Sequence, residues 1–207
     1  GQEDASGETA ARYLLARGMT QVDRLILTHF DADHCNGVRQ LLRRVRVKTL
    51  YVPELSPESP LRTKILFAAA QVECEIRFVT EDLTLPDGMR IFAPTGSADE
   101  SNTGLCVLAA GEKYDILMTG DLSAQAEYRL LSTHELPRAA VLVAGHHGAD
   151  SSTSEALLRA VKPEAVLISV GADNHFGHPA DETLRRIEEA GAAVYRTDRS
   201  GTITIRG

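Results

Sequence analysis

The sequence has few cysteines, no long apolar run and no excess of positive charge, and each shortage excludes a class of protein. Its three cysteines are odd in number and far apart, which fits neither a disulfide framework nor a cysteine-based zinc site. No stretch approaches about eighteen consecutive apolar residues, so no membrane span is predicted, and the polar residues 1–15 do not resemble a signal peptide. A net charge of −7 argues against a surface that binds nucleic acid all over, although it allows a bound dication.

Short apolar runs alternate with amphipathic segments along the chain. With 207 residues, of which 43% are hydrophobic, the chain can form one domain with a core, and we expect that domain to span residues 1–207. Alternating strands and helices predict an α/β fold with mixed sheets. Strands are expected at 23–28, 48–52, 75–79, 105–110, 114–118, 139–144, 165–170, 193–196 and 201–205. Helices are expected at 8–18, 37–45, 60–73, 123–132, 153–161 and 180–190, with a hairpin around Asp87–Gly88 in a β-rich stretch 80–101.

Polar clusters follow several of the predicted strands. In layered α/β proteins, ligands gather beyond the carboxyl ends of strands, so these clusters are candidates for a shared site. Five of the seven histidines belong to them. The clusters are His29 to His34 after "LILT", Asp121 after "DILMT", His146 and His147 after "VLVA", and His178 beyond "VLISV".

The segment "HFDADH" is the strongest of these signals. His29, Asp31, Asp33 and His34 alternate with apolar residues, and so many acidic and imidazole groups would repel or lose solvation without a metal. Each smaller cluster has an ordinary alternative. A Gly-Asp pair is commonly a turn, a His-His pair is commonly exposed, and Asp33 could cap the following helix. Together, the clusters predict a metal site.

The ligand types indicate which metal and which chemistry. Imidazoles suit zinc, oxygen-rich sites suit manganese or magnesium, and this set mixes both without a thiolate. A carboxylate can bridge two adjacent metals, which together activate a water and neutralise charge on a phosphodiester.

The order of the motifs resembles a known family. "THFDADH" is similar to the HxHxDH signature of the metallo-β-lactamase fold, with Asp31 in the place of the second His. Four further segments make the whole set resemble the C-terminal domain of ComEC-type DNA-uptake channels of competent bacteria. They are "TGD" (119–121), "GHHGADSSTS" (145–154), "SVGADNHFGHP" (169–179) and "YRTDRSGTITI" (195–205).

The resemblance implies a four-layer αβ/βα sandwich that lacks its first N-terminal strands, as part of a longer membrane protein. It implies two divalent metal ions, Mn²⁺ or Zn²⁺. His29 and Asp31 would hold one, Asp33 and His34 the other, and Asp121 would bridge them. His146 is the expected remaining ligand, with His147 a close rival. The expected catalytic residues are His178, as a general acid or phosphate binder, together with His147 and Asp33.

Candidate substrate-binding residues come from two further segments. Asn102 stands where relatives carry a further His, so the first metal site is expected to be loose or to favour manganese. Ser151, Ser152 and Thr153 precede a predicted helix and are expected either to bind phosphate or only to cap that helix. Two departures from the family pattern, Asn36 and Ala149, would weaken catalysis without removing the metals.

The resemblance implies a metal-dependent nuclease that degrades DNA, single- or double-stranded, and specifically the strand that is not imported. The parent protein would lie in the cell membrane, with its channel portion as a partner and this domain on the extracytoplasmic face. Two alternatives stay open: a small-molecule phosphodiesterase of the phosphorylcholine esterase type, and a non-catalytic domain that guides DNA. β-Lactam hydrolysis is less favoured than these.

Overall fold

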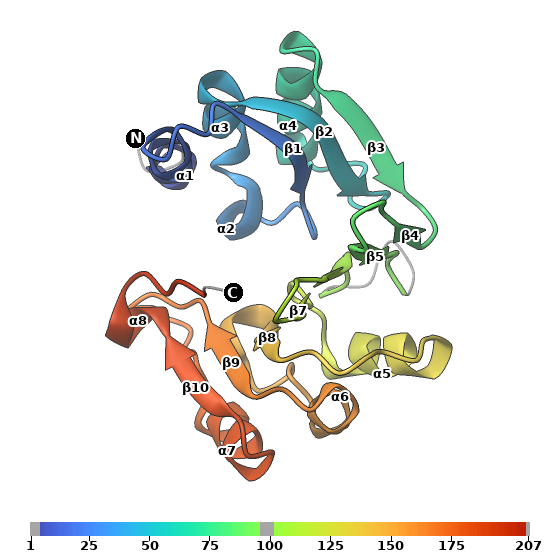
Figure 1. Cartoon of the computed structure of the whole chain (residues 1–207), viewed down its shortest axis with the longest axis vertical. Coiled ribbons are helices and arrows are strands. Elements are labelled where there is room, and N and C mark those ends of the chain that lie inside the picture. Colours follow the sequence, from blue (N-terminus) through green and yellow to red (C-terminus); the bar gives the residue numbers. More distant parts are fainter. Residues whose placement is uncertain (1–4, 96–101, 206–207) are drawn as a thin grey trace. The chain divides into compact units, whose positions relative to one another are not determined.

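The computed structural model describes residues 5–95 and 102–205, and the chain divides into two compact units, residues 1–80 and 81–207. Each unit has its own sheet (Figure 1). Each also has its own cluster of buried hydrophobic residues. None of the helices in the described part is long and apolar enough to cross a membrane. That residues 1–207 act as a single domain of a longer membrane protein stays a prediction.

The first unit contains a parallel three-stranded sheet in the order β1-β2-β3 within its described residues. Its strands are β1 (Gln21–Ile26), β2 (Arg46–Pro53) and β3 (Glu75–Val79). Its helices are α1 (Ala5–Leu15), α2 (Ala32–Cys35), α3 (Val38–Arg44) and α4 (Pro60–Gln71). The buried side chains of Leu50 and Val52 on β2 pack with Ile65 of α4, and Phe30 joins the same cluster. Because Phe30 is anchored in this core, the residues on either side of it are placed at the end of β1.

The second unit contains a mixed seven-stranded sheet in the order β10-β9-β8-β7-β6-β5-β4 within its described residues. Its strands are β4 (Leu83–Thr84), β5 (Arg90–Phe92), β6 (Cys106–Ala109), β7 (Ile116–Met118), β8 (Val141–Val143), β9 (Ala165–Ile168) and β10 (Ala193–Arg196). Its helices are α5 (Ala124–Thr133), α6 (Glu155–Val161), α7 (Asp181–Glu189) and α8 (Thr197–Ser200), with a 3₁₀ turn at Gly145–Gly148.

Three neighbouring strands of this sheet place the candidate site of the second unit. β7, β8 and β9 are parallel, so their carboxyl ends meet at the same edge of the sheet. Asp121 follows β7, the turn with His146 and His147 follows β8, and the loop with His178 follows β9. The sequence expectation that these clusters follow strands is therefore confirmed.

Most predicted elements are present, with one clear error. The hairpin around Asp87–Gly88 is confirmed by the antiparallel pairing of β4 and β5, although residues 96–101 of that β-rich stretch lie outside the described residues. The predicted strand at 201–205 is wrong, because those residues form no strand. Its alternating Thr and Ile side chains suit a strand, but β propensity needs a pairing neighbour. Instead, the Thr197 hydroxyl exchanges hydrogen bonds with the main chain of Val170, and α8 turns the chain away after β10.

Candidate functional site

The loop after β1 brings together all four predicted residues of the segment 29–34. The ring centroids of His29 and His34 are 4.1 Å apart. His29 Nε2 lies 3.7 Å from Asp31 Oδ2, and His34 Nε2 lies 3.8 Å from Asp33 Oδ2. His29 is buried, whereas both carboxylates are largely exposed. The first unit therefore presents two imidazoles and two carboxylates on one short segment.

Helix capping does not explain the two carboxylates. Asp31 occupies the N-cap position of α2 but makes no side-chain capping hydrogen bond. Asp33 lies inside α2, and the N-cap position of α3 is Gly37. The alternative in which Asp33 caps the following helix is therefore wrong.

A neighbouring hydroxyl orients the His29 ring. Thr28 Oγ1 lies 2.9 Å from His29 Nδ1, within hydrogen-bonding distance. Metal-binding histidines commonly use one ring nitrogen for the metal and the other for such a partner. This arrangement suits metal binding through Nε2, the nitrogen that faces Asp31.

The three cysteines are buried and free. Cys35 ends α2, and its thiol donates a hydrogen bond to the carbonyl of Asp31 at 3.1 Å. Burial, and then the charges of Asp31 and Asp33, raise the pKa of the Cys35 thiol to about 12. A thiol that stays protonated is a poor metal ligand, so the candidate ligands of this segment are imidazoles and carboxylates.

The second cluster lies at the carboxyl ends of β7 and β8. The buried carboxylate of Asp121 lies 3.8 Å from His146 Nε2, and the His146 main-chain N–H donates to the Gly120 carbonyl at 3.1 Å. The His146 ring lies 6.4 Å from the His147 ring and 5.6 Å from the His178 ring, measured between centroids. The structure therefore brings together the predicted residues of this unit, Asp121, His146, His147 and His178.

The two histidines after β8 have unusual backbone angles. His146 has φ 48° and His147 has φ 55°, in the left-handed region that non-glycine residues seldom adopt. Strain of this kind persists only where surrounding contacts require it. Gly145 is one such contact, because an added Cβ would lie 3.2 Å from both Thr119 Oγ1 and Ser152 Cβ. The turn is thus held in a conformation that fixes the backbone of two adjacent histidines.

Hydrogen bonds assign ring nitrogens in this turn. His147 Nδ1 lies 2.7 Å from the carbonyl oxygen of Ser169, which can only accept, so Nδ1 carries the proton and a neutral ring leaves Nε2 as the acceptor. His146 Nδ1 is buried and has no hydrogen-bond partner among the residues that the structure describes. Buried polar atoms normally have a partner, so this nitrogen suits an additional ligand. The donors of this unit fit a divalent metal.

His178 lies in the loop after β9 and is held by Asn174. The Asn174 side chain accepts from the His178 main-chain N–H at 2.9 Å and donates to the His178 carbonyl at 2.8 Å. Burial, and then the nearby His146 and His147, lower the pKa of His178. A neutral imidazole is therefore favoured near pH 7, and it can donate one hydrogen bond to a phosphate oxygen.

Glu127 on α5 was not among the residues predicted from the sequence. Its fully buried carboxylate accepts from the main-chain N–H groups of Thr153 at 2.7 Å and Ser154 at 2.8 Å. The Thr153 hydroxyl in turn accepts from the Gly145 N–H at 2.9 Å. The sequence does contain a signal for a buried charge here, because Glu127 lies on the apolar face of a helix, beside the buried Ala126 and Leu130.

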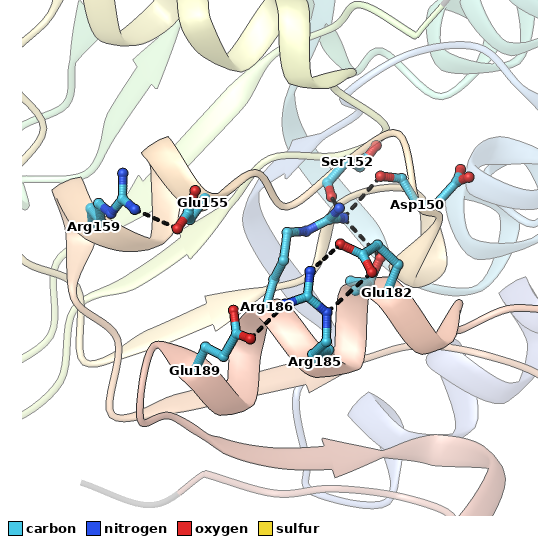
Figure 2. A network of polar contacts seen from close by, with 9 residues as sticks. Asp150, Ser152, Glu155, Arg159, Glu182, Arg185, Arg186 and Glu189 are labelled. Carbon is cyan, nitrogen blue, oxygen red and sulfur yellow. Dashed lines mark hydrogen bonds and ion pairs between the residues drawn. The ribbon is translucent and has the colours of Figure 1, made fainter.

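Arg186 on α7 holds the same segment from another direction (Figure 2). Its Nη2 atom donates to the carbonyls of Asp150 and Ser152 at 2.8 and 2.9 Å, and to Thr183 Oγ1 at 3.0 Å. The segment 145–154 is therefore fixed by a buried carboxylate and a guanidinium that lie on two different helices.

The four predicted substrate-binding residues have different environments. Ser151 is exposed, whereas the side chains of Ser152 and Thr153 are buried. The hydroxyl that caps α6 is that of Ser154, which accepts from the Leu157 N–H at 3.2 Å. Asn102 has φ 58°, and its carbonyl accepts from the Ser123 N–H at 3.0 Å. Whether these residues bind substrate stays a prediction, but only Ser151 presents an exposed side chain.

Comparisons with known families and solved structures support the fold that the sequence motifs predicted. The family model of the metallo-beta-lactamase superfamily matches residues 4–172. Among solved structures, the metallo-beta-lactamase fold protein YhfI from Bacillus subtilis matches with a TM-score of 0.50 and 14% identity, over 84% of this chain and 74% of that chain. At this identity the likeness concerns the fold alone, and the predicted fold class is confirmed.

Curated relatives are ComEC-type competence proteins, as the motifs indicated. ComE operon protein 3 of Bacillus subtilis is 32% identical, over 94% of this chain and 26% of its own length. Competence protein ComA of Neisseria gonorrhoeae is 29% identical, over 92% and 26%, and recombination protein 2 of Haemophilus influenzae is 29% identical, over 93% and 23%. The chain therefore spans about a quarter of the length of these relatives.

Proposed function

Because the chain belongs to the metallo-beta-lactamase superfamily, whose members are typically metal-dependent hydrolases, we propose that it hydrolyses phosphodiester bonds in DNA with two divalent cations, Mn²⁺ or Zn²⁺. One observation carries the proposal. In each unit, imidazoles and carboxylates gather directly beyond the ends of strands, and the buried thiols do not compete with them. This donor set suits zinc or manganese.

We assign the ligands by the order of the motifs along the chain. His29 and Asp31 would hold one cation, Asp33 and His34 the other, and Asp121 would bridge the two. His146 is the proposed remaining ligand, with His147 as its rival. The contacts within each unit support this assignment, since His29 faces Asp31, His34 faces Asp33, and His146 faces Asp121.

When bound, the cations would neutralise charge on the phosphate and activate a water. The protein side chains then have separate tasks. The lowered pKa of His178 favours a neutral ring that donates a hydrogen bond to a phosphate oxygen, whereas Asp33 and His147 are the other proposed catalytic residues. Asn174 keeps the His178 backbone in place during this step.

The relatives suggest the biological setting. Because they are competence proteins of which the chain spans a quarter, we propose that this domain belongs to a DNA-uptake channel in the cell membrane. It would lie on the extracytoplasmic face and degrade the strand that is not imported. Single- or double-stranded DNA and the channel portion of the parent protein are the proposed partners.

Incubation of the chain with linear single- and double-stranded DNA and with Mn²⁺ or Zn²⁺ tests the proposal. DNA cleavage is expected, and the Asp121→Ala and His34→Ala variants should lose it by several orders of magnitude while staying folded. Asp23→Ala, an exposed carboxylate paired with Lys48, is the control that should cleave like the parent. Metal content is measured on the same samples.

Two other outcomes would replace the proposal. Cleavage of bis-p-nitrophenyl phosphate without cleavage of DNA would favour a small-molecule phosphodiesterase. Binding of DNA without any cleavage, and without bound metal, would favour a domain that only guides DNA.

A further inference from the structure

Phe176 is an apolar ring in solvent beside the candidate site of the second unit. Its side chain is 81% exposed, the largest exposed fraction among the large hydrophobic residues in the described part of the chain. It lies two residues before His178, in the loop that follows β9. Single exposed hydrophobic side chains are common on protein surfaces, so the orientation of this ring and its neighbours, rather than its exposure alone, indicate a role.

The Phe176 ring has a defined orientation. It stacks on the His178 ring, with the centroids 5.8 Å apart and the ring planes only 14° from parallel. The loop around it is closed by Asn174, whose side chain bonds the carbonyls of Gly171 at 3.0 Å and His178 at 2.8 Å. The ring therefore lies nearly parallel to an imidazole while staying largely exposed, in a loop that Asn174 closes.

A flat, exposed ring of this kind suits a flat, aromatic partner. Nucleobases in single strands stack on aromatic side chains, whereas bases in a duplex are already stacked on one another. The Phe176 ring stacks on the His178 ring, which in turn lies 5.6 Å from the His146 ring between centroids. A stacked base would thus place a phosphodiester next to the imidazoles.

We propose that Phe176 is a stacking platform for an unpaired nucleobase of single-stranded DNA. The inference rests on the proposed function for its substrate and adds the strand form that the site accepts. Base stacking on an aromatic side chain changes affinity by roughly 5- to 150-fold per base. The same ring would add little affinity for a chain of sugar phosphates without bases.

The test compares two fluorescent single strands about ten units long, which is within the range of single-strand site sizes. One is oligothymidylate, and the other has tetrahydrofuran units in place of every base. Their affinities are measured by anisotropy in the Asp121→Ala background, which prevents turnover. Oligothymidylate should bind roughly 5- to 150-fold more tightly. Phe176→Ala should bring this ratio close to one, and Phe176→Tyr should retain it.

Phe67→Ala is the matched control, because Phe67 is also exposed, at 67%, but lies on α4 of the first unit. It should keep the parent ratio. An equal affinity for both strands in the parent, or an undiminished ratio in Phe176→Ala, would overturn the inference. Absence of DNA cleavage by the wild-type chain would instead overturn the proposed function and leave the binding ratio to decide on Phe176.

Discussion

The buried carboxylate of Glu127 accepts hydrogen bonds from two successive main-chain N–H groups, those of Thr153 and Ser154, at 2.7 and 2.8 Å. Through the Thr153 hydroxyl, this contact continues to the N–H of Gly145, the residue before His146 and His147. A single carboxylate on α5 therefore supports the turn that carries two candidate ligands.

Replacement of Glu127 should destabilise the fold. Glu127→Ala leaves two main-chain donors without an acceptor and opens a cavity, which should lower the free energy of unfolding by about 2–4 kcal/mol. Glu127→Gln keeps one acceptor oxygen and should cost less. Urea denaturation measures both. Glu155→Gln, an exposed residue paired with Arg159, should have little effect, and an equally small effect of Glu127→Ala would contradict this account.

The same residue predicts a pH dependence of stability. Burial raises the pKa of Glu127 above its usual value of 4.5, against the opposing effect of its hydrogen bonds. Since the folded state then favours the protonated carboxyl, the stability it contributes is fully present below pH 4.5 and is lost as the pH rises through the folded pKa. The difference in unfolding free energy, wild type minus Glu127→Gln, should fall as the pH rises above 4.5. A difference that rises with pH would contradict a raised pKa of Glu127.

Arg186 should matter more than its neighbour Arg185. Arg186→Ala removes three hydrogen bonds to Asp150, Ser152 and Thr183, which should cost about 1–3 kcal/mol and loosen the segment 145–154. Arg185 pairs only with Glu182 and Glu189 on its own exposed helix face among its described contacts, so Arg185→Ala should cost much less. Thermal unfolding and metal titration of the two variants compare them. Equal losses of stability in the two variants would show that Arg186 stabilises α7 itself and not the segment 145–154.

Substitutions of Gly148 and Gly191 distinguish the cost of steric crowding from the cost of a positive φ angle. Gly148 has φ 83°, and an added Cβ would lie 2.7 Å from Pro179 Cβ and 3.3 Å from Ile168 Cγ2. Gly191 has φ 77°, with nothing within 4 Å of an added Cβ. Gly191→Ala should cost about 1–2 kcal/mol for the backbone alone, and Gly148→Ala about 1–3 kcal/mol more. Denaturation midpoints measure the difference. Similar losses of stability in the two variants would show that the residues around Gly148 shift to accommodate a Cβ at little cost.

Sequence patterns predicted much of this protein because they report local properties. Apolar runs bounded by polar residues placed nearly all strands, and the polar residues after β1, β7, β8 and β9 were recognised as candidates. The error at 201–205 has a non-local cause, since alternating Thr and Ile residues describe a strand only if another strand pairs with them. The roles of Ser152 and Thr153 were equally open, because burial and partners do not follow from residue type.

The sequence by itself determined the family, the alternation of strands and helices, and the identity of the imidazoles and carboxylates that follow the strands. Only the tertiary structure decided which distant groups hydrogen-bond to the segments that carry these side chains. Glu127 is 26 positions from Thr153, and Arg186 is 34 from Ser152. The stacking of Phe176 on His178 likewise depends on the closed loop around Asn174. Periodicity and residue type act over a few residues, whereas hydrogen-bond partners and burial depend on which distant segments the sheet brings together.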